Sequence, residues 1–313
     1  MIAFVFPGQG SQYVGMGQEL YREFKTARQV FEEASDTVGC DLAKLCFEDN
    51  AGQLDLTVNA QPAILTVSVA ALKVLQEETG IQPDFVAGHS LGEYTALVAN
   101  GALEFKDAVW VVRKRGQFTQ EAVPFGVGAM AAVLGLQEAE VEEICKYVSN
   151  EKLIVSPANF NAPGQTVIAG HREAVERAAD IAKERGARRV VILDVSAPFH
   201  CKLMAPAAKR LSEVLDEVTF HDFRVPIVTN FDAQINFNVS NLKHLLVNQV
   251  MNPVRWCESV RVLYERGVRS FFEIGPKNVL SGLIKRIVSD VEVYNFEKPN
   301  QLDLLRGLSY DGV

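Results

Sequence analysis

The sequence GHSLG at residues 88–92 combines the residue types that a nucleophilic serine requires. A serine acts as a nucleophile when it lies on a sharp turn between a strand and a helix, because its Oγ is then exposed and the next backbone N–H points at the substrate oxygen. An apolar run at residues 85–87 precedes the motif and a helix-like segment follows it. Glycine and serine are common, so the five letters alone are a weak signal. The context makes Ser90 a candidate nucleophile.

An ordinary helix start explains part of the same motif. In that interpretation Ser90 caps the helix, with Glu93 at the capping-box position three residues later. It leaves Gly88 and Gly92 unexplained, whereas both glycines suit a tight turn that needs positive φ and close packing. The residues favour a nucleophile and keep the cap as the alternative.

A serine hydroxyl needs a neighbouring base to remove its proton. His89 lies inside the motif, and we expect it to pack away from the reaction side of Ser90. His200 follows a predicted strand in the sequence APFH, where side chains are presented to ligands; it is the candidate base, with a structural histidine as the alternative. Its orienting partner stays open between Asp194 and a backbone carbonyl. The remaining histidines lie in a predicted helix start or in polar stretches: His171, His221 and His244.

Two further segments bear on substrate binding. The glycine-rich residues 7–17 lack the GxxxxGK[ST] pattern of a phosphate loop. Arg113, Lys114 and Arg115 share a predicted helix, where a guanidinium is able to grip a carboxylate through two parallel hydrogen bonds. The same three residues also fit a solvated helix face. No cluster of His, Cys and Asp has metal-ligand spacing, so we expect no metal site.

The composition narrows the class of protein. The 313 residues are 48% hydrophobic and 22% charged, which is typical of a globular chain with one large α/β domain and an inserted subdomain. The net charge of −8, from 31 basic and 39 acidic residues, argues against a binder of nucleic acids or anionic membranes. Five scattered cysteines without a CxxC pair indicate reduced thiols in a cytoplasmic protein. The N-terminal apolar run stops at Pro7, too early for a signal peptide or membrane span.

Apolar periodicity predicts that strands and helices alternate along the chain. Strands are predicted at residues 2–6, 83–88, 226–230 and 268–276, and helices at residues 19–34, 62–78, 91–101, 107–121, 204–217 and 278–288, with two more on either side of Pro253. This order favours a mostly parallel sheet covered by helices. Between residues 126 and 196 the order becomes β-α-β-β-α-β, a ferredoxin-like arrangement. We therefore expect a large α/β domain at 1–125 and 197–313, with a subdomain at 126–196.

Six sequence blocks occur in one order: GQGSQ, GHSLGEYTA, RGQFTQEAVPFGVGAM, APFHC, NQVMNPVRW and FFEIGP. Together they closely resemble the malonyl-CoA:acyl-carrier-protein transacylases, acyltransferases of fatty-acid and polyketide synthesis. The resemblance covers nearly the whole chain. It implies an α/β-hydrolase-like large domain that carries a ferredoxin-like insertion, which agrees with the rhythm of strands and helices.

The resemblance also implies a catalytic pair. Ser90 matches the serine that becomes acylated, and His200 matches its general base. In this family a main-chain carbonyl near Asn248 and Gln249 holds the histidine, which leaves Asp194 a structural role.

Further residues match the groups that bind the substrate. The backbone N–H groups of Gln9 and Leu91 match the oxyanion hole, which meets negative charge only as the tetrahedral intermediate forms. Arg115 matches the arginine that binds the malonyl carboxylate, and Gln249 matches a residue beside it. Phe199 matches the aromatic residue that narrows the pocket against α-branched acyl groups.

The resemblance implies that malonyl is transferred from malonyl-CoA to the phosphopantetheine thiol of acyl carrier protein by a ping-pong route. No resident cofactor is expected, since CoA is part of the substrate, and a cytoplasmic monomer is expected. A polyketide acyltransferase acting in trans would share every residue named, whereas a thioesterase or esterase would not need Arg115. A binding module is the non-enzymatic alternative. For carrier docking the candidates are Arg188, Arg189, Lys285 and Arg286, which also fit an ordinary surface.

Overall fold

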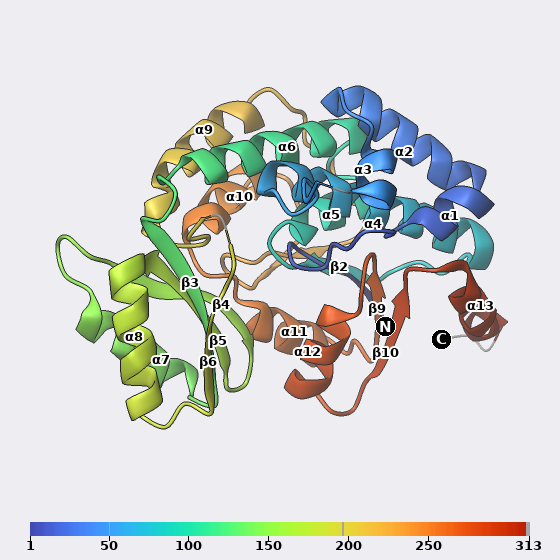
Figure 1. Cartoon of the computed structure of the whole chain (residues 1–313). Coiled ribbons are helices and arrows are strands. Elements are labelled where there is room, and N and C mark those ends of the chain that lie inside the picture. Colours follow the sequence, from blue (N-terminus) through green and yellow to red (C-terminus); the bar gives the residue numbers. More distant parts are fainter. Residues whose placement is uncertain (50, 196, 311–313) are drawn as a thin grey trace.

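Two β-sheets of different kinds organise the chain (Figure 1). The computed structural model describes residues 1–49, 51–195 and 197–310. The larger sheet has the strand order β10-β9-β1-β2-β7-β8. Its strands are β1 (Ile2–Phe6), β2 (Phe85–Gly88), β7 (Ile227–Val228), β8 (Ile235–Asn236), β9 (Ser270–Ile274) and β10 (Glu292–Phe296). All neighbours pair in parallel except β7 and β8, which confirms the predicted mostly parallel sheet.

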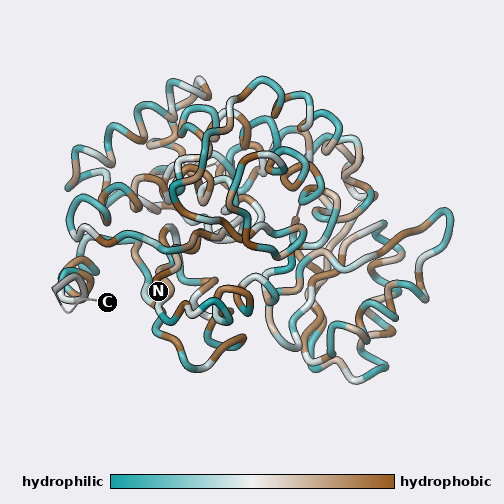
Figure 2. The backbone as a smooth tube through the Cα atoms, turned by 180° about the vertical axis from the view of Figure 1, so that it is seen from behind, coloured by the Kyte–Doolittle hydropathy of each residue, from teal (hydrophilic) through white to brown (hydrophobic). Residues whose placement is uncertain are grey.

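Strand β1 is an inner strand of this sheet, and both of its faces are covered. Phe4 and Phe6 pack into one hydrophobic core, while Ala3 and Val5 pack into a second core on the opposite face. Every residue of β1 is buried, as expected for a parallel strand that reads as an unbroken apolar run. Outer helices such as α2 and α8 alternate hydrophobic and hydrophilic residues along the backbone tube (Figure 2) and bury one side.

Helices cover the two faces of the large sheet unequally. The first face is covered by α1 (Gln18–Glu23), α2 (Lys25–Val38), α3 (Leu42–Glu48), α4 (Thr57–Thr79), α5 (Gly92–Ala99), α6 (Phe105–Glu121), α9 (Ala205–Leu215), α10 (Leu242–Met251) and α13 (Leu302–Tyr310). The second face is covered by α11 (Trp256–Glu265) and α12 (Val279–Ile287), which lie on the other side of the sheet in Figure 1. The result is a layered α/β arrangement.

The prediction of one helix over residues 19–34 is wrong. Helices α1 and α2 are separated at Phe24, whose backbone is extended at φ −113° and ψ 127°. The break brings the Phe24 side chain against the first core. Among the described residues, four α-helices and β-strands have no counterpart in the sequence predictions: α3, β8, β10 and α13. β8 is only two residues long, and such an element carries no periodicity to detect.

Helix α4 runs through the first core, as its apolar sequence predicts. It is the one described helix long and apolar enough to cross a membrane, yet 83% of that apolar window is buried inside the fold. Pro62 lies within it and has no N–H to offer the carbonyl of Val58. Arg113 donates to that carbonyl through Nη1 at 2.9 Å, so helix α6 satisfies the group that the proline leaves free.

The second sheet follows the predicted β-α-β-β-α-β order. It contains β3 (Gly128–Leu134), α7 (Glu138–Val148), β4 (Val155–Ala162), β5 (Gln165–His171), α8 (Arg172–Glu184) and β6 (Arg189–Ile192). Its strands are antiparallel in the order β4-β5-β3-β6, and α7 and α8 pack on one face. The predicted boundary at residue 196, and residues 311–313 of the predicted large domain, lie outside the described residues.

The other face of the small sheet packs against the segment that leads back to the large sheet. Met130 and Ala158 pack with Cys201 and Phe199, where the chain returns to the large sheet. Strand β4 also pairs with Val254 through two backbone hydrogen bonds of 2.9 Å, one from Phe160 N–H and one to the Ala158 carbonyl. The residues around His200 are therefore held between the two sheets.

Candidate active site

Ser90 lies in the turn between β2 and α5, as predicted, but the turn differs in detail. Ser90 itself has positive φ, at 53°, while Gly88 and Gly92 do not. A Cβ on Gly88 would lie 1.9 Å from the carbonyl oxygen of Gly92, and a Cβ on Gly92 would lie 2.1 Å from that of Phe6. Positive φ was thus the wrong reason for the two glycines; close packing requires them.

Contacts from two distant segments hold Ser90 in this strained conformation. The Ser90 N–H donates to Asn230 Oδ1 at 2.6 Å, and Asn230 Nδ2 donates to the Gly88 carbonyl at 2.7 Å. Gln249 Nε2 donates to the Ser90 carbonyl at 2.9 Å. The predicted alternative, a capping box at Ser90 and Glu93, does not form, because α5 has no side-chain cap.

The Ser90 hydroxyl faces His200. Ser90 Oγ lies 2.8 Å from His200 Nε2, and His200 Nδ1 lies 2.7 Å from the carbonyl oxygen of Gln249. A carbonyl oxygen only accepts, so Nδ1 carries the proton and Nε2 is left to accept from the serine. Of the two orienting partners left open by the sequence, the structure has the carbonyl. Asp194 is exposed and lines the cavity, and it makes no hydrogen bond to the described part of the chain.

Burial sets the protonation state of His200. Its side chain is 4% exposed, and this burial, followed by the nearby positive charge of Arg115, lowers the pKa of the imidazole to about 3. The Gln249 carbonyl offsets part of the effect, because it accepts a hydrogen bond from the ring. His200 is therefore neutral near pH 7, the form that a general base requires.

Arg115 is a buried cation that points at the serine. Its side chain is 3% exposed, which excludes the solvated-face alternative. Nη1 donates to Gln61 Oε1 at 2.8 Å, and Nη2 donates to Gln249 Oε1 and to Ser90 Oγ, each at 3.0 Å. Within the described residues no carboxylate lies within ion-pair distance of it. Burial lowers the pKa of the guanidinium, so an incoming anion would find a poorly compensated positive charge.

Two backbone N–H groups beside the serine are candidates for an oxyanion hole. The N–H groups of Gln9 and Leu91 donate to no acceptor in the part of the chain that the structure describes. The loop that carries Gln9 lies against the serine turn, since a Cβ on Gly8 would be 2.4 Å from the His89 carbonyl oxygen. The Gln9 side chain donates to Thr57 Oγ1 at 3.1 Å, which ties this loop to α4. Two such donors are able to stabilise an oxyanion.

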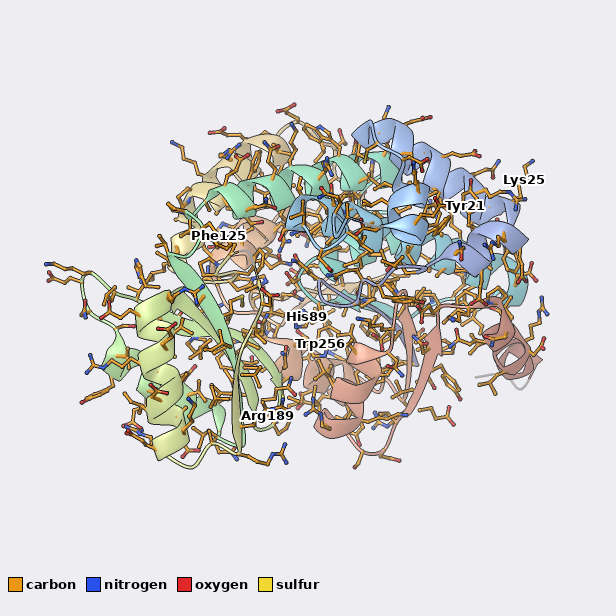
Figure 3. All side chains as sticks on the ribbon, in the orientation of Figure 1. Tyr21, Lys25, His89, Phe125, Arg189 and Trp256 are labelled. Atoms are coloured by element: carbon orange, nitrogen blue, oxygen red, sulfur yellow. The ribbon has the colours of Figure 1, made fainter. Side chains whose placement is uncertain are left out.

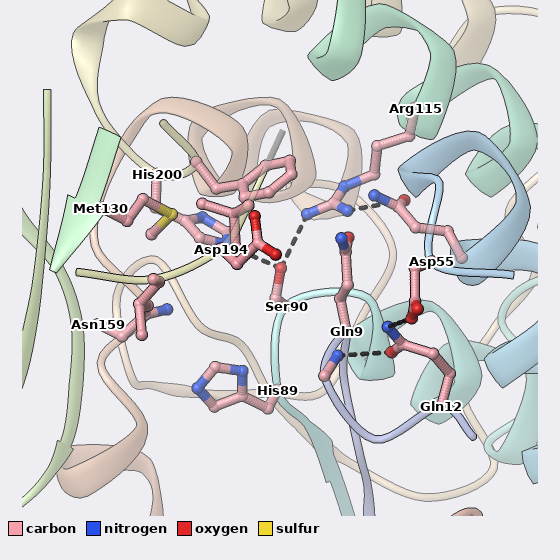
Figure 4. A pocket seen from close by; sticks show the side chains of 15 residues that line it. Gln9, Gln12, Asp55, His89, Ser90, Arg115, Met130, Asn159, Asp194 and His200 are labelled. Atoms are coloured by element: carbon pink, nitrogen blue, oxygen red, sulfur yellow. Dashed lines mark hydrogen bonds between the residues drawn. The ribbon is translucent and has the colours of Figure 1, made fainter. Parts of the chain in front are cut away.

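These groups share one cavity of about 510 Å³ between the two sheets (Figure 4). The cavity is lined by Ser90 from the turn after β2, Arg115 from helix α6 and Gln9 from the loop after β1. Strands β3 and β4 of the small sheet contribute Met130 and Asn159. Phe199 and His200 also reach it. Gln249 is fully buried and acts on the cavity through its hydrogen bonds. Across residues 1–49, 51–195 and 197–310, no group of three His, Cys, Asp or Glu side chains is arranged to hold a metal.

The remaining histidines stay apart from the reaction. His89 bonds through Nε2 to Asn161 Oδ1 at 2.8 Å and packs on Trp256, at the junction of the two sheets in Figure 3. It therefore packs as predicted, although its ring borders the cavity. His171, His221 and His244 do not line it.

Comparison with known proteins places this geometry in a family. Residues 3–298 match the acyl transferase domain family. The chain belongs to this family. Malonyl CoA-acyl carrier protein transacylase of Bacillus subtilis (strain 168) is 49% identical over 303 residues, covering 97% of this chain and 95% of the relative. The enzyme of the same name from Escherichia coli (strain K12) is 47% identical over 300 residues, covering 96% and 97%.

Solved structures of malonyltransferases also resemble this acyl transferase over nearly its whole length. An acyl carrier protein S-malonyltransferase from Vibrio cholerae is 44% identical with a TM-score of 0.94, covering 97% of this chain and 99% of that one. A malonyl-transacylase in complex with a holo type II PKS acyl-carrier protein is 46% identical with a TM-score of 0.95, covering 98% and 99%. The chain is an acyltransferase with the mixed α/β fold of these enzymes.

Sequence reasoning missed three residues of this acyl transferase site. Asn230 holds the serine turn, Gln61 holds Arg115, and Glu93 accepts hydrogen bonds from Asn230 N–H at 2.8 Å and Gln249 Nε2 at 3.0 Å. Asn230 follows β7, and the carboxyl ends of parallel strands meet at one edge of a sheet. That rule was the available signal for Asn230. Neither Gln61 nor Glu93 has a comparable one.

Proposed function

We propose that this acyltransferase moves the malonyl group from malonyl-CoA to the phosphopantetheine thiol of an acyl carrier protein, through a malonyl ester on Ser90. One observation carries the proposal. Arg115 is a buried guanidinium whose Nη2 lies 3.0 Å from Ser90 Oγ, with no carboxylate partner among the described residues. An acyl group with its own carboxylate supplies that partner beside the nucleophile.

The first half-reaction attaches the acyl group to the protein. His200 Nε2 removes the Ser90 proton as Oγ attacks the thioester carbon, and the carbonyl oxygen becomes an oxyanion. The N–H groups of Gln9 and Leu91 donate to this oxyanion. When the tetrahedral intermediate collapses, the C–S bond breaks and His200 returns the proton to the departing CoA thiolate. The route needs neither a metal nor a resident cofactor, because CoA enters as part of the substrate.

The second half-reaction reverses these steps with a different thiol. His200 takes the proton of the carrier's phosphopantetheine thiol, and the sulfur attacks the malonyl ester. The C–O bond to Ser90 breaks and the serine recovers its proton from His200. His200 is neutral at the start of each half-reaction because burial lowers its pKa to about 3.

Three residues in and beside the cavity set the substrate selectivity. Arg115 binds the malonyl carboxylate through two N–H groups, and Gln249 orients the guanidinium through its Oε1. Phe199 borders the cavity next to His200 and narrows it against α-branched acyl groups. These roles make malonyl the preferred acyl group.

We assign the two sheets to two structural units. Residues 1–125 and 197–313 form an α/β-hydrolase-like domain, and residues 126–196 form a ferredoxin-like subdomain. The strand order β4-β5-β3-β6 with both helices on one face supports the second assignment. The first is supported by a nucleophile turn after a central parallel strand.

An acidic carrier protein would dock on basic residues near both units. Arg188 and Arg189 are exposed at the start of β6, and Lys285 and Arg286 are exposed on α12. Arg286 donates to Gln165 Oε1 at 2.6 Å and so links α12 to β5 of the small sheet. A monomer in the cytoplasm, where carrier and CoA thioesters meet, completes the proposal.

A polyketide carrier is the second candidate acceptor. The structural relative bound to a type II PKS acyl-carrier protein favours this alternative, at 46% identity. Transfer rates from malonyl-enzyme to purified fatty-acid and polyketide carriers would rank the two acceptors. A thioesterase or esterase accounts less well for Arg115, since hydrolysis of a neutral acyl group needs no buried cation.

Intact-mass analysis after mixing the protein with malonyl-CoA, without a carrier, tests the proposal. We expect a stable adduct of one malonyl group on the wild type and none on Ser90→Ala, because Oγ is the only group placed to be acylated in the described cavity. Free malonate without an adduct would instead identify a hydrolase.

A further inference from the structure

Glu93 is a buried carboxylate that the proposed reaction does not use. It is 1% exposed, and its Oε2 accepts both of its hydrogen bonds, from Asn230 N–H at 2.8 Å and from Gln249 Nε2 at 3.0 Å. Oε1 has no hydrogen-bond partner in the described part of the structure. A buried carboxylate is costly unless a counter-charge compensates it, so its stability depends on a cation nearby.

Arg115 is that cation, and one amide group separates the two charges. Gln249 donates to Glu93 through Nε2 and accepts from Arg115 Nη2 through Oε1 at 3.0 Å. No direct ion pair joins Glu93 to Arg115 in the described residues. Two opposite charges are thus buried together and coupled through a shared side chain rather than by contact.

The charged groups near Glu93 act on its ionised form in opposite directions. Asp232, in the turn after β7, adds a second negative charge, while Arg115 from α6 is the cation that favours ionisation. His200, on the far side of Gln249, is neutral because burial lowers its pKa to about 3. Burial, and to a smaller extent Asp232, raises the pKa of Glu93 to about 7. A small change in the charge near Arg115 therefore changes the protonation of Glu93 in the physiological range.

We propose that Glu93 is the counter-charge of Arg115 in the empty site, and that it takes up a proton when a malonyl carboxylate binds the arginine. This inference rests on the malonyl transfer proposed above. The balance is simple: one carboxylate enters with the substrate and one proton enters from solvent. The net charge inside the site is zero in both states: Arg115 with ionised Glu93 before binding, and Arg115 with the malonyl carboxylate and protonated Glu93 after it. A proton on Oε1 leaves both hydrogen bonds to Oε2 intact.

Binding and protonation are coupled because Glu93 and the malonyl carboxylate compete for the same cation, Arg115. A malonyl carboxylate on Arg115 offsets the attraction by which the arginine, together with the hydrogen bonds from Asn230 and Gln249, favours ionised Glu93. It also adds a second negative charge across Gln249. An acetyl group brings no charge, so it leaves Glu93 as it was. Proton uptake therefore distinguishes acyl groups that carry a carboxylate from those that do not. Glu93 acts through Arg115 and Gln249, as a positioning residue that never touches the substrate.

Proton uptake during acylation is the direct test. The protein is mixed with malonyl-CoA or acetyl-CoA in weak buffer at pH 8, uptake is followed with an indicator dye, and adduct is counted by intact mass. We expect close to one proton per malonyl group, because Glu93 with a pKa of about 7 is mostly ionised at pH 8. We expect none per acetyl group. Both donors release the same CoA thiol and acylate the same serine, so any change at His200 cancels in the comparison.

Glu93→Gln is the matched variant. An amide oxygen at the Oε2 position accepts the same two hydrogen bonds, and the amide nitrogen occupies the unpartnered Oε1 position. We expect its malonyl adduct to form without proton uptake, whereas Asp232→Asn, which removes the neighbouring carboxylate, keeps the uptake. If protonation accompanies binding, the wild-type KM for malonyl-CoA rises about tenfold per pH unit above the pKa of Glu93, and that of Glu93→Gln stays flat.

Three results would overturn the inference. A wild-type malonyl adduct that forms without proton uptake contradicts it, as does equal uptake by wild type and Glu93→Gln. Equal uptake with malonyl and acetyl groups contradicts it as well. If the wild type forms no malonyl adduct, the proposed function fails and the inference fails with it, so the mass measurement separates the two cases. The wild-type comparison of malonyl with acetyl stands even if Glu93→Gln does not fold.

Discussion

The site has a neutral end and a charged end, and the hydrogen bond from Arg115 to Ser90 joins them. At one end Ser90 and His200 are uncharged, and burial keeps them so by lowering the pKa of His200 to about 3. At the other end Arg115 and Glu93 are both buried and ionisable, with the amide of Gln249 between them. The exclusion of water that keeps His200 neutral also strengthens the attraction between Arg115 and a carboxylate that enters the cavity. Gln249 serves both ends, with its backbone carbonyl on His200 and its side chain on Arg115.

Removing the base should have the largest effect. His200→Ala leaves Ser90 Oγ without its acceptor at 2.8 Å, so we expect malonyl-enzyme formation to slow by about 10³- to 10⁴-fold. Single-turnover mass spectrometry measures the rate. His221→Ala, an exposed histidine outside the cavity, is the control and should react like the wild type. A loss below tenfold would contradict the role of His200 as base.

Removing the cation should have a smaller but selective effect. In Arg115→Ala we expect malonyl transfer to fall on the order of 10²- to 10³-fold while acetyl transfer changes much less, since only malonyl loses a charged hydrogen-bond partner. Lys114→Ala, on the same helix but outside the cavity, should change neither rate. Steady-state kinetics with both donors make the comparison. Equal losses with the two donors would argue that Arg115 supports the serine rather than the carboxylate.

Loosening the serine turn should affect both acyl groups alike. Asn230→Ala removes the acceptor of the Ser90 N–H and the donor to the Gly88 carbonyl. We expect kcat/KM to fall about 10- to 100-fold for malonyl and acetyl donors together, because each unpaired buried group costs about 1–3 kcal/mol. A loss confined to the malonyl donor would indicate that Asn230 supports Arg115 and Glu93 rather than the serine turn.

Stability against pH tests the same contrast without any turnover, because His200 and Glu93 act on it with opposite sign. His200 has a lower pKa folded than unfolded, so between about pH 3 and 6.5 the unfolded chain binds more protons and the free energy of unfolding rises with pH. Glu93 has a higher pKa folded, at about 7, so between about pH 4.5 and 7 the folded protein binds more protons and that free energy falls with pH.

Single variants should separate these opposing slopes. In urea unfolding, His200→Gln should leave a fall of up to about 1.4 kcal/mol per pH unit between pH 4.5 and 7, caused by Glu93. Glu93→Gln should leave a rise of similar size between pH 4.5 and 6.5, caused by His200. The wild type should be nearly flat across the shared window as far as these two groups contribute. Parallel pH profiles for both variants would refute the assignment of opposite pKa shifts.

The sequence predicted those parts of the site that depend on residues close together in the chain. The turn at residues 88–92 was recognisable because glycine is required where a Cβ would collide with backbone, and both glycines lie within two residues of Ser90. The strand β1 and the helix α4 were recognisable from continuous apolar sequence. The break at Phe24 was not, because a helix-compatible pattern runs through it and only packing against the first core decides it.

The sequence by itself determined the chemical types present: a serine in a strand-to-helix turn, few histidines, a cluster of cations on a helix, and an alternation of strands and helices. Tertiary structure alone decided which histidine meets the serine, which of Arg113, Lys114 and Arg115 is buried, and which acceptor orients His200. These choices depend on residues 25 to 159 positions apart along the chain, such as Ser90 with Arg115 and with Gln249. Burial and counter-charge, which set the pKa of both His200 and Glu93, exist only once those segments pack together.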